Sequence, residues 1–191
     1  MNKSELRLLY KERRKMLDKE TRATYDAVIL SHLERMDWSD VKLLHVYIPI
    51  DSLNEPDTLS FMNWLKQLKN DVRFVVSRSD FDSGEMSHFL WDESMILEAN
   101  KWGILEPKGG AEVKELDLDV VLVPLLVVDK RGNRVGYGKG FYDRFLARCR
   151  PDVATIGLSY YEPVDCISDL GEFDIPIKTC VTPQKIYDFS K

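Results

Sequence analysis

The sequence predicts an α/β fold in three layers, with a mostly parallel central sheet flanked by helices. Short apolar runs alternate along the chain with longer segments whose apolar residues recur at helical spacing, a pattern typical of parallel strands joined by helices. The most apolar run, residues 120–128, contains no polar side chain, as in a central strand buried on both faces. A chain of 191 residues can bury one core, so we expect a single domain over 1–191.

Four segments have the periodicity of helices. In the first of them Leu6, Leu9, Tyr10 and Leu17 fall at helical spacing, and Ser4 stands where a cap is expected. The predicted helices are 3–18, 21–36, 58–68 and 141–150.

Other runs are rich in apolar and β-branched residues and indicate strands. Residues 84–91 alternate in polarity, as in an outer strand or hairpin, and Gly103 and Pro107 indicate a loop or turn over 102–107. Ligands in parallel sheets bind outside the carboxyl ends of strands, which is where a glycine-rich segment follows residues 120–128. The predicted buried strands are 41–47, 72–76, 120–128, 153–158 and 178–182.

Composition excludes several classes of protein. The net charge is -5 and the pI is near 5.3, which argues against a nucleic-acid partner. No apolar run reaches the roughly 18 residues of a membrane span, and the N-terminal residues lack the apolar core of a secretory signal. Three cysteines without CxxC spacing fit a reducing compartment, so we expect a cytoplasmic protein without membrane contact.

The glycine-rich segment 134–144 is the strongest chemical signal. Glycines at 136, 138 and 140 let the backbone approach a ligand closely, and a helix beginning just after them would aim N–H groups at an anion. Lys139 and Arg134 suit phosphate oxygens, and Asp143 suits Mg²⁺. The spacing fits neither a Walker A loop nor the dinucleotide fingerprint. Spacing alone leaves two interpretations, a phosphate-binding loop and a glycine-rich turn.

This segment closely resembles the signature of the 5-formyltetrahydrofolate cyclo-ligase family, also called methenyltetrahydrofolate synthetases. Four other stretches match the family in the same order along nearly the whole chain, and an ordered set is more specific than any one of them. They are Lys3-x-x-Leu6-Arg7, Glu55-x-Asp57-Thr58, Trp102-Gly103-Ile104-Leu105-Glu106-Pro107 and Asp129-x-x-Gly132.

The resemblance implies an ATP-dependent ligase. ATP and 5-formyltetrahydrofolate would give 5,10-methenyltetrahydrofolate, ADP and phosphate, with Mg²⁺ required. The γ-phosphoryl group would activate the formyl oxygen, N10 would attack, and phosphate would leave. Such catalysis depends mainly on positioning and charge neutralisation. The expected partners are therefore two small molecules, ATP and a reduced folate, bound by a monomer or weak homodimer.

The resemblance also implies roles for individual residues. Lys139 and Arg134 would act in catalysis, Asp143 and Asp174 would bind Mg²⁺, and the carboxylate of Glu55 would accept N–H bonds from the pterin. The residues expected to bind ATP are Lys3, Arg7, Arg134, Val135, Gly136, Tyr137, Gly138, Lys139, Gly140, Phe141 and Tyr142, and those expected to bind folate are Glu55, Ile50, Tyr137, Gly138, Lys139, Gly140 and Phe141.

The chain also departs from the family pattern. Phe141 and Phe173 stand where many members have Tyr and His, and Asp174 fits an ordinary turn as well as a metal site. The aromatic ring of Trp102 suits either ring stacking or packing, and His45 within an apolar run is expected to be packed. Two other functions therefore stay open, a folate- or nucleotide-binding module without turnover and an ATP-dependent enzyme acting on another small substrate.

Overall fold

The computed structural model describes residues 1–101 and 103–190, and it has four α-helices and two 3-10 helices in that part of the chain. The helices are α1 (Lys3–Lys15), α2 (Lys19–Leu33), η1 (Asp51–Leu53), α3 (Thr58–Leu68), η2 (Glu115–Asp117) and α4 (Phe141–Arg148). The strands are β1 (Leu43–His45), β2 (Arg73–Ser79), β3 (Met86–Leu90), β4 (Leu97–Ala99), β5 (Leu105–Pro107), β6 (Val120–Pro124), β7 (Val127–Val128), β8 (Arg134–Val135), β9 (Ala154–Leu158), β10 (Thr179–Val181) and β11 (Ile186–Asp188).

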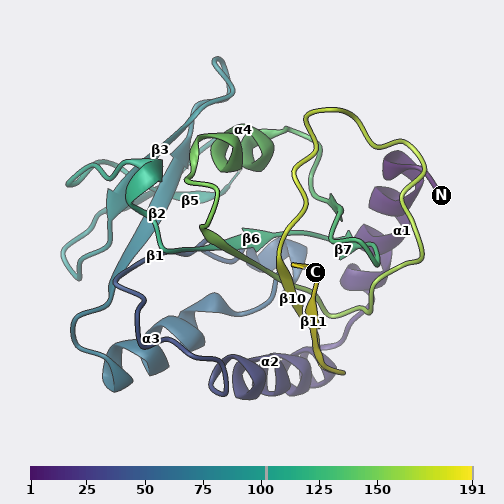
Figure 1. Cartoon of the computed structure of the whole chain (residues 1–191), viewed down its shortest axis with the longest axis horizontal. Helices are drawn as coiled ribbons and strands as arrows, with labels where there is room; N and C mark the ends of the chain where they lie inside the picture. Colours follow the sequence, from purple (N-terminus) through teal and green to yellow (C-terminus); the bar gives the residue numbers. More distant parts are fainter. Residues whose placement is uncertain (102, 191) are drawn as a thin grey trace.

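The central sheet confirms the predicted α/β fold. Its seven strands lie in the order β11-β10-β9-β6-β1-β2-β3 (Figure 1). The inner pairs are parallel, and the outer pairs β2–β3 and β10–β11 are antiparallel. The sheet is therefore mostly parallel, as the alternating pattern predicts.

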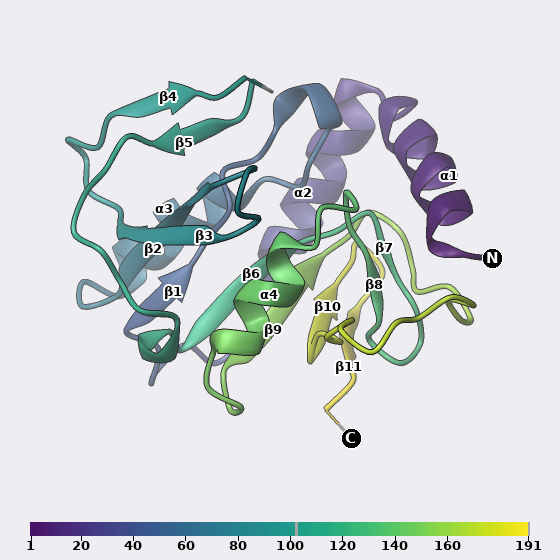
Figure 2. The same cartoon turned by 90° about the horizontal axis from the view of Figure 1, so that it is seen from above.

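Helices cover both faces of this sheet (Figures 1 and 2). Successive side chains of a strand point to opposite faces. Val120 and Leu122 accordingly pack with α2 and α3, whereas Val121 and Val123 pack with Phe145 of α4. Both sides of β6 are buried, which accounts for its unbroken apolar sequence.

Helix α1 lies beside β7 and β8, at the margin of the sheet (Figure 2). Its apolar stripe, Leu6 and Tyr10, packs against Val127 and Val135. The N-terminus of the helix is closed by Asn2, whose side chain accepts a hydrogen bond from the amide of Glu5, not by Ser4. The helix begins at Lys3 as predicted, and only its capping residue differs from the expected Ser4.

Two predicted elements are wrong. The expected strand 120–128 is two strands, because β6 ends at Pro124, and β7 turns away to pair antiparallel with β8. Proline has no N–H with which to continue the hydrogen-bond ladder of β6. Both β6 and β7 are buried and apolar, so the polarity pattern of the sequence did not reveal the break. The expected turn 102–107 contains β5, which pairs with β4 in a two-stranded ribbon where a terminal proline is tolerated. Residue 102 lies outside the described residues.

The remaining differences are at element ends. The first helix stops at Lys15 because Asp18 caps α2 through the amide of Thr21, and α2 in turn ends at Leu33. Asp57 likewise caps α3, which matches the expected bounds 58–68. The other predicted strands and the last helix are present with ends moved by a few residues.

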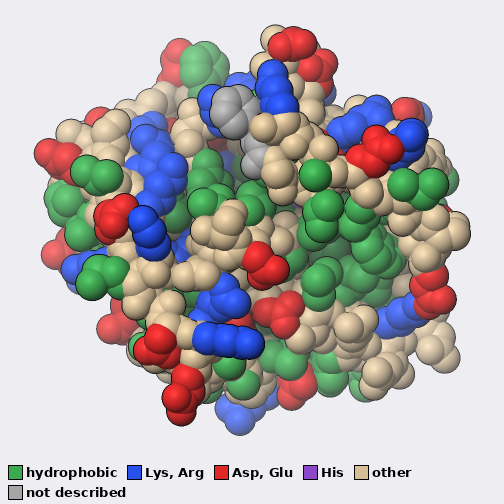
Figure 3. All heavy atoms as spheres, turned by 180° about the vertical axis from the view of Figure 1, so that it is seen from behind, with side chains coloured by type: hydrophobic (Ala, Val, Ile, Leu, Met, Phe, Trp, Pro, Cys, Tyr) green, Lys and Arg blue, Asp and Glu red, His purple; other side chains and the backbone are tan. Residues whose placement is uncertain are grey.

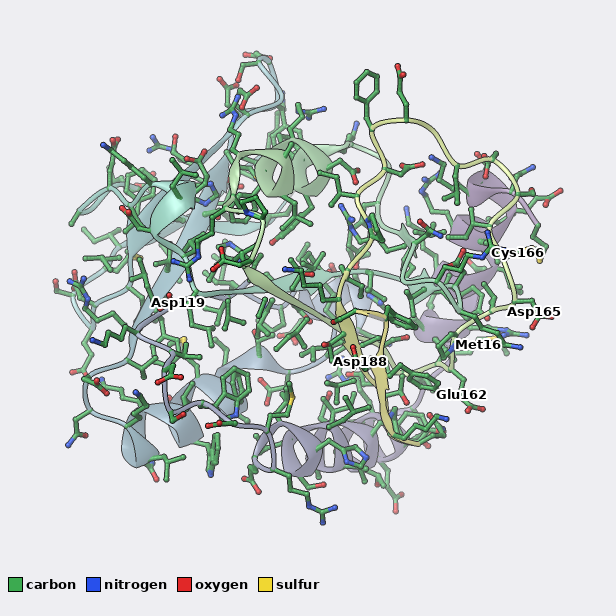
Figure 4. The ribbon with its side chains drawn as sticks, in the orientation of Figure 1. Met16, Asp119, Glu162, Asp165, Cys166 and Asp188 are labelled. Atoms are coloured by element: carbon green, nitrogen blue, oxygen red, sulfur yellow. The ribbon has the colours of Figure 1, made fainter. Side chains whose placement is uncertain are left out.

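The amino-terminal edge of the parallel strands is closed by Asp119 (labelled in Figure 4). Its carboxylate accepts hydrogen bonds from the amides of Lys42 and Leu43 at 2.8 and 2.9 Å and pairs with Arg150 at 2.7 Å. Burial would raise the pKa of Asp119, but these bonds outweigh it and hold the pKa below its usual value. This edge is occupied by the protein's own contacts, which leaves the carboxyl-terminal edge for a ligand.

The surface and the cysteines add two facts. Basic and acidic side chains are interspersed on the face shown in Figure 3, around a hollow where apolar side chains are visible. Cys149 and Cys180 are buried thiols, whereas Cys166 is exposed on the loop after β9 (Figure 4). No helix in the described part of the chain is long and apolar enough to cross a bilayer.

Candidate active site

A cavity of about 600 Å³ opens at the carboxyl ends of β1, β2 and β6. Every residue predicted for the site lines it except Val135. The Val135 side chain is buried among Tyr10, Leu126 and Val127, and its carbonyl accepts the amide of Leu126 at 2.8 Å. The structure therefore brings the predicted residues together, and the predicted ATP contact of Val135 stays a prediction.

Glycines shape the wall of the cavity where the chain turns from β8 into α4. Gly138 has φ +87° and Gly140 has φ +69°, a region that other residues rarely adopt. A Cβ on Gly138 would also lie 3.0 Å from the guanidinium carbon of Arg7. Gly140 is the N-cap of α4, so the amino end of that helix and its partial positive charge face the cavity.

Two basic residues line the cavity beside these glycines. Arg7 extends from α1 and donates from Nε to the carbonyl of Gly136 at 3.0 Å. This bond fixes the guanidinium against the glycine wall, and the residue lines the cavity. Lys139 lies between the two left-handed glycines and lines the same cavity. Cations held at a helix amino end are suited to phosphate oxygens.

Two ion pairs form a second group, which we call the ion-pair cluster: Lys3, Arg134, Asp143 and Asp174. Arg134 donates to Asp143 Oδ1 at 2.7 Å and also donates to the carbonyl of Ile175. Lys3 Nζ lies 2.7 Å from Asp174 Oδ2. The backbone amide of Ile175 donates to Asp143 Oδ1 at 3.2 Å. Both predicted metal ligands are thus paired with predicted phosphate-binding cations.

Electrostatics in this cluster favour the charged form of Asp174. Burial would raise the pKa of Asp174, but the hydrogen bonds from Lys3 and from the amide of Gly171 outweigh it, so the pKa lies below its usual value. Burial lowers the pKa of Arg134, and the nearby carboxylate of Asp143 opposes that effect. Asp174 is therefore ionised at neutral pH and able to accept a cation.

A third group is buried deeper, and we call it the Glu55 cluster: Ile50, Glu55, Tyr137 and Arg14. Glu55 is only 6% exposed. Its Oε1 accepts the Tyr137 hydroxyl at 2.5 Å, and its Oε2 accepts the Ile50 amide at 2.8 Å. Each carboxylate oxygen can accept a further bond, so the group can still receive two N–H donors from a ligand.

The chain around Glu55 is held in an uncommon conformation. Helix η1 ends at Asn54, which has φ +48°. The side chain of Asn54 donates to the carbonyl of Arg14 at 2.9 Å and accepts from Arg22 at 2.6 Å. Asparagine tolerates the left-handed region better than most residues. These bonds fix the loop that presents Glu55 to the cavity.

Burial dominates the ionisation of the Glu55 cluster. It raises the pKa of Glu55, while the Tyr137 hydroxyl, the Ile50 amide and the charge of Arg14 act to lower it. Burial also raises the pKa of Tyr137 and keeps its hydroxyl neutral, so the hydroxyl donates to Glu55. Carboxyl groups whose pKa is shifted by burial and by specific partners occur more often at functional sites than on the protein surface.

The donor set fits Mg²⁺ bound together with phosphates. Asp143 and Asp174 both face the cavity, and Mg²⁺ is commonly held by one or two carboxylates with phosphate oxygens and water. No three His, Cys, Asp or Glu side chains gather as a metal cage within residues 1–101 and 103–190. Any Mg²⁺ here would therefore depend on a phosphate-bearing ligand for much of its coordination.

Two buried histidines lie beside the cavity. His45 Nε2 and His88 Nδ1 each lie 2.8 Å from the Ser77 hydroxyl, and His45 packs edge-on against Phe145. Burial lowers the pKa of His45 to about 3 and that of His88 to about 4. Both are therefore neutral near pH 7. Full burial and the contact with Phe145 confirm that His45 is a packed residue, although it also lines the cavity.

Sequence reasoning missed Arg14, which supports the site without lining the cavity. It stands in a run of basic residues typical of a solvated helix face, but it is 1% exposed and bonded to Tyr137. A signal was present, because Leu6, Tyr10 and Arg14 are spaced four residues apart and share the buried face of α1. A charge on an apolar stripe indicates a buried partner.

The two departures from the family pattern have different surroundings. Phe141 lines the cavity and packs edge-on against Phe81, so it replaces the family's tyrosine within the site. Phe173 is 78% exposed and is not among the lining residues. Trp102, the proposed stacking residue, lies outside the described part of the chain.

Fold and site together define an α/β protein with a glycine-walled, cation-rich cavity at the carboxyl ends of its parallel strands. The model of the 5-formyltetrahydrofolate cyclo-ligase family matches residues 1–182. The chain therefore belongs to the 5-formyltetrahydrofolate cyclo-ligase family.

Individual relatives agree with this assignment. The 5-formyltetrahydrofolate cyclo-ligase of Escherichia coli (strain K12) is 28% identical over 172 residues, which cover 87% of this chain and 86% of that protein. The mitochondrial 5-formyltetrahydrofolate cyclo-ligase of Arabidopsis thaliana is 28% identical over 184 residues, covering 83% of this chain and 66% of that protein. The structure of Aquifex aeolicus 5,10-methenyltetrahydrofolate synthetase superposes with a TM-score of 0.78 at 26% identity, covering 100% of this chain and 94% of that one.

Proposed function

We propose that this chain converts 5-formyltetrahydrofolate to 5,10-methenyltetrahydrofolate, consuming ATP with Mg²⁺ and releasing ADP and phosphate. One observation carries the proposal: a single cavity joins a glycine wall with cations to a buried carboxylate. The first suits a triphosphate, and the second suits the N–H edge of a pterin. Membership of the cyclo-ligase family supports the same substrates.

The phosphate end would use the glycine wall and its cations. The amino end of α4 supplies oriented N–H groups, and Lys139, Arg7 and Arg134 supply positive charge along the wall. Fixed donors of this kind stabilise charge on a transferring phosphoryl group without reorganisation. Lys139 and Arg134 are the proposed catalytic cations, because they line the cavity at the start of α4 and at β8.

The ion-pair cluster would exchange partners when Mg²⁺ and ATP arrive. Its two carboxylates and two cations neutralise each other in the absence of ligand. Phosphates can replace the carboxylates around Lys3 and Arg134, and Asp143 and Asp174 can then hold Mg²⁺. The metal would neutralise developing phosphate charge, whereas the protein orients the triphosphate.

The folate end would use Glu55 and its aromatic neighbours. The two Glu55 oxygens, each already holding one donor, can accept the two N–H groups of an aminopyrimidine edge. Tyr47, Ile48 and Tyr137 line the cavity beside the carboxylate and can pack on the ring. Ile50 acts through its amide, which orients Glu55.

The chemistry is then a phosphoryl transfer followed by a ring closure. The formyl oxygen forms a bond to the γ-phosphorus while the bond to the β-phosphate oxygen breaks, which releases ADP. N10 attacks the activated carbon, the carbon–oxygen bond breaks, phosphate leaves with the formyl oxygen, and N10 loses its proton. The protein holds the folate and ATP together, so that both steps occur within one complex.

The proposal is tested by incubating the purified protein with 5-formyltetrahydrofolate, ATP and Mg²⁺. We expect the absorbance of 5,10-methenyltetrahydrofolate to appear together with stoichiometric ADP and phosphate. Omitting ATP should abolish the product. Folate binding without turnover would instead identify a binding module, and ATP hydrolysis driven only by another compound would identify a different enzyme.

The cellular location and the oligomeric state form a separate part of the proposal. We propose a cytoplasmic enzyme that acts as a monomer or weak homodimer on two small molecules. The cysteine pattern and the acidic composition support the location. Sedimentation of the purified protein at several concentrations would test the assembly.

A further inference from the structure

Arg14 is a buried cation without a carboxylate beside it. Its side chain is among the most deeply buried of the large ones, and no ion-pair partner lies within 4 Å of it in residues 1–101 and 103–190. Its NH2 donates to the carbonyl of Leu125, and its NH1 donates to the Tyr137 hydroxyl at 2.8 Å. Its Nε has no hydrogen-bond partner among the described residues.

Burying an arginine without a carboxylate partner is an energetically unfavourable way to fill a core position. Transferring a guanidinium out of water costs several kcal/mol, and apolar residues of similar volume often serve packing as well or better. Leu6 and Tyr10 fill the two preceding positions of the same stripe by packing alone. The charge of Arg14 therefore needs an explanation other than the stability of α1.

The second hydrogen bond of the Tyr137 hydroxyl provides that explanation. It accepts from Arg14 and donates to Glu55 Oε1 at 2.5 Å, so one hydroxyl links the cation to the carboxylate. The backbone carbonyl of Arg14 also accepts the Asn54 side chain at 2.9 Å, one residue before Glu55. Arg14 thus contacts both the glycine wall and the loop that carries the carboxylate.

We propose that Arg14 is a positioning residue for reduced-folate binding: through the Tyr137 hydroxyl, it orients the Glu55 carboxylate toward the cavity and places a positive charge one hydroxyl away from it. The inference rests on the proposed function, because it assigns Glu55 to the folate. An ionised Glu55 accepts two N–H bonds from an aminopyrimidine edge. A protonated Glu55 would instead place its own O–H donor opposite an N–H donor of the ligand.

The tyrosines around Glu55 stay neutral. Tyr47 follows β1, Tyr137 belongs to the glycine wall, Tyr142 lies on α4 and Tyr160 follows β9, and burial raises the pKa of each. The Tyr160 hydroxyl faces the Glu55 carbonyl at 3.3 Å and Asp26 at 2.7 Å. Arg14 is the cation joined to Glu55 through the Tyr137 hydroxyl, whereas Lys11 lies over the Tyr137 ring at 5.6 Å and makes no such link.

The test begins with the steady-state kinetics of Arg14→Met, Arg14→Lys and a matched control, Arg13→Met. Arg13 is the neighbouring arginine of α1, but it is exposed and lies over the Tyr10 ring. We expect Arg14→Met to raise the KM for 5-formyltetrahydrofolate about tenfold, as loss of a charge-assisted bond usually does. The KM for ATP should change little, and Arg13→Met should match the wild type.

The pH profile separates a charge effect from a packing effect. Without the positive charge, the pKa of Glu55 should rise further, so the acid limb of kcat/KM for the folate should move to higher pH. Arg14→Lys keeps the charge and should leave that limb in place. A purely structural role would lower activity toward both substrates without moving the limb.

Tyr137→Phe keeps the test decisive if Arg14→Met does not fold. It retains the buried arginine but removes the linking hydroxyl, and we expect the same folate-selective loss. Adding Arg14→Met to Tyr137→Phe should then cause little further change. A wild-type KM for the folate in Tyr137→Phe, or an unmoved acid limb in a folded Arg14→Met, would overturn the role of Arg14. Inactive wild-type protein would instead refute the proposed function.

Discussion

The Glu55 cluster and the ion-pair cluster lie in one cavity but are built in opposite ways. Glu55 is held by a neutral hydroxyl and a backbone amide, with its cation one hydroxyl away. Asp143 and Asp174 are instead paired directly with Arg134 and Lys3. The first arrangement leaves the acceptor capacity of the carboxylate available, whereas the second uses it for the protein's own cations.

This difference indicates how each end would treat its ligand. A carboxylate with unused acceptor capacity in a buried, fixed position can bind an N–H edge without rearrangement. A carboxylate already paired with a cation must change partner before it holds a metal, and this change is favourable when phosphate takes the cation at the same time. Folate binding should therefore be largely independent of ATP, whereas the binding of Mg²⁺ and ATP should be coupled.

The largest expected effect is in the ion-pair cluster. Arg134→Ala removes a proposed phosphate contact and also removes the arginine donor from Asp143 and from the Ile175 carbonyl. We expect kcat to fall about 100-fold or more, as for loss of a fixed transition-state donor. The exposed Arg131→Ala, three residues earlier, is the control and should retain normal turnover. A kcat near that of the wild type for Arg134→Ala would remove Arg134 from the catalytic set.

A smaller effect is expected from Asp143→Asn. The amide can still accept from Arg134 but is a poor ligand for Mg²⁺, so the Mg²⁺ concentration for half-maximal activity should rise about tenfold or more. Asp165→Asn, which removes an exposed carboxylate paired with Lys130, should leave the titration unchanged. An unaltered Mg²⁺ titration for Asp143→Asn would place the metal elsewhere.

The smallest expected effect concerns stability rather than catalysis. His45 has a folded pKa of about 3 against 6.5 for an unperturbed histidine, so between these values only the unfolded state takes up the proton. The free energy of unfolding should therefore fall on acidification below pH 6.5, by up to about 1.4 kcal/mol per pH unit for this one group. Urea unfolding at pH 7, 6 and 5 would measure it, and His45→Asn should show a shallower pH dependence. Equal slopes for the two proteins would contradict the buried-histidine explanation.

The fold was largely predictable because its signals are local and mutually consistent. The doubly buried strand around Val121 and the glycines before α4 each act through a pattern of neighbouring residues. The break at Pro124 was not predictable, because β7 is as apolar as β6 and its partner β8 contains only two residues. Strand pairing depends on residues far apart in the sequence, which polarity alone does not reveal.

The site was predictable to a different degree at its two ends. Glycine spacing and charge pointed to the phosphate end, and the family resemblance supplied Glu55. The contacts of Arg14 join residues 123 positions apart and were not visible in any local pattern except its place on the buried stripe. The pairing of Lys3 with Asp174, 171 positions apart, was hidden for the same reason.

The claim that the two ends serve different substrates is tested most directly by calorimetric binding of 5-formyltetrahydrofolate in the absence of ATP. Wild type, Glu55→Gln and Lys139→Ala would be compared at one pH. We expect Glu55→Gln to weaken folate binding about tenfold or more, because a buried acceptor is replaced in part by a donor. Lys139 belongs to both predicted sets, but its cation suits phosphate oxygens, so Lys139→Ala should lose affinity mainly for ATP and keep most of its folate affinity. Wild-type folate affinity in Glu55→Gln, together with a loss in Lys139→Ala, would contradict this division of the cavity.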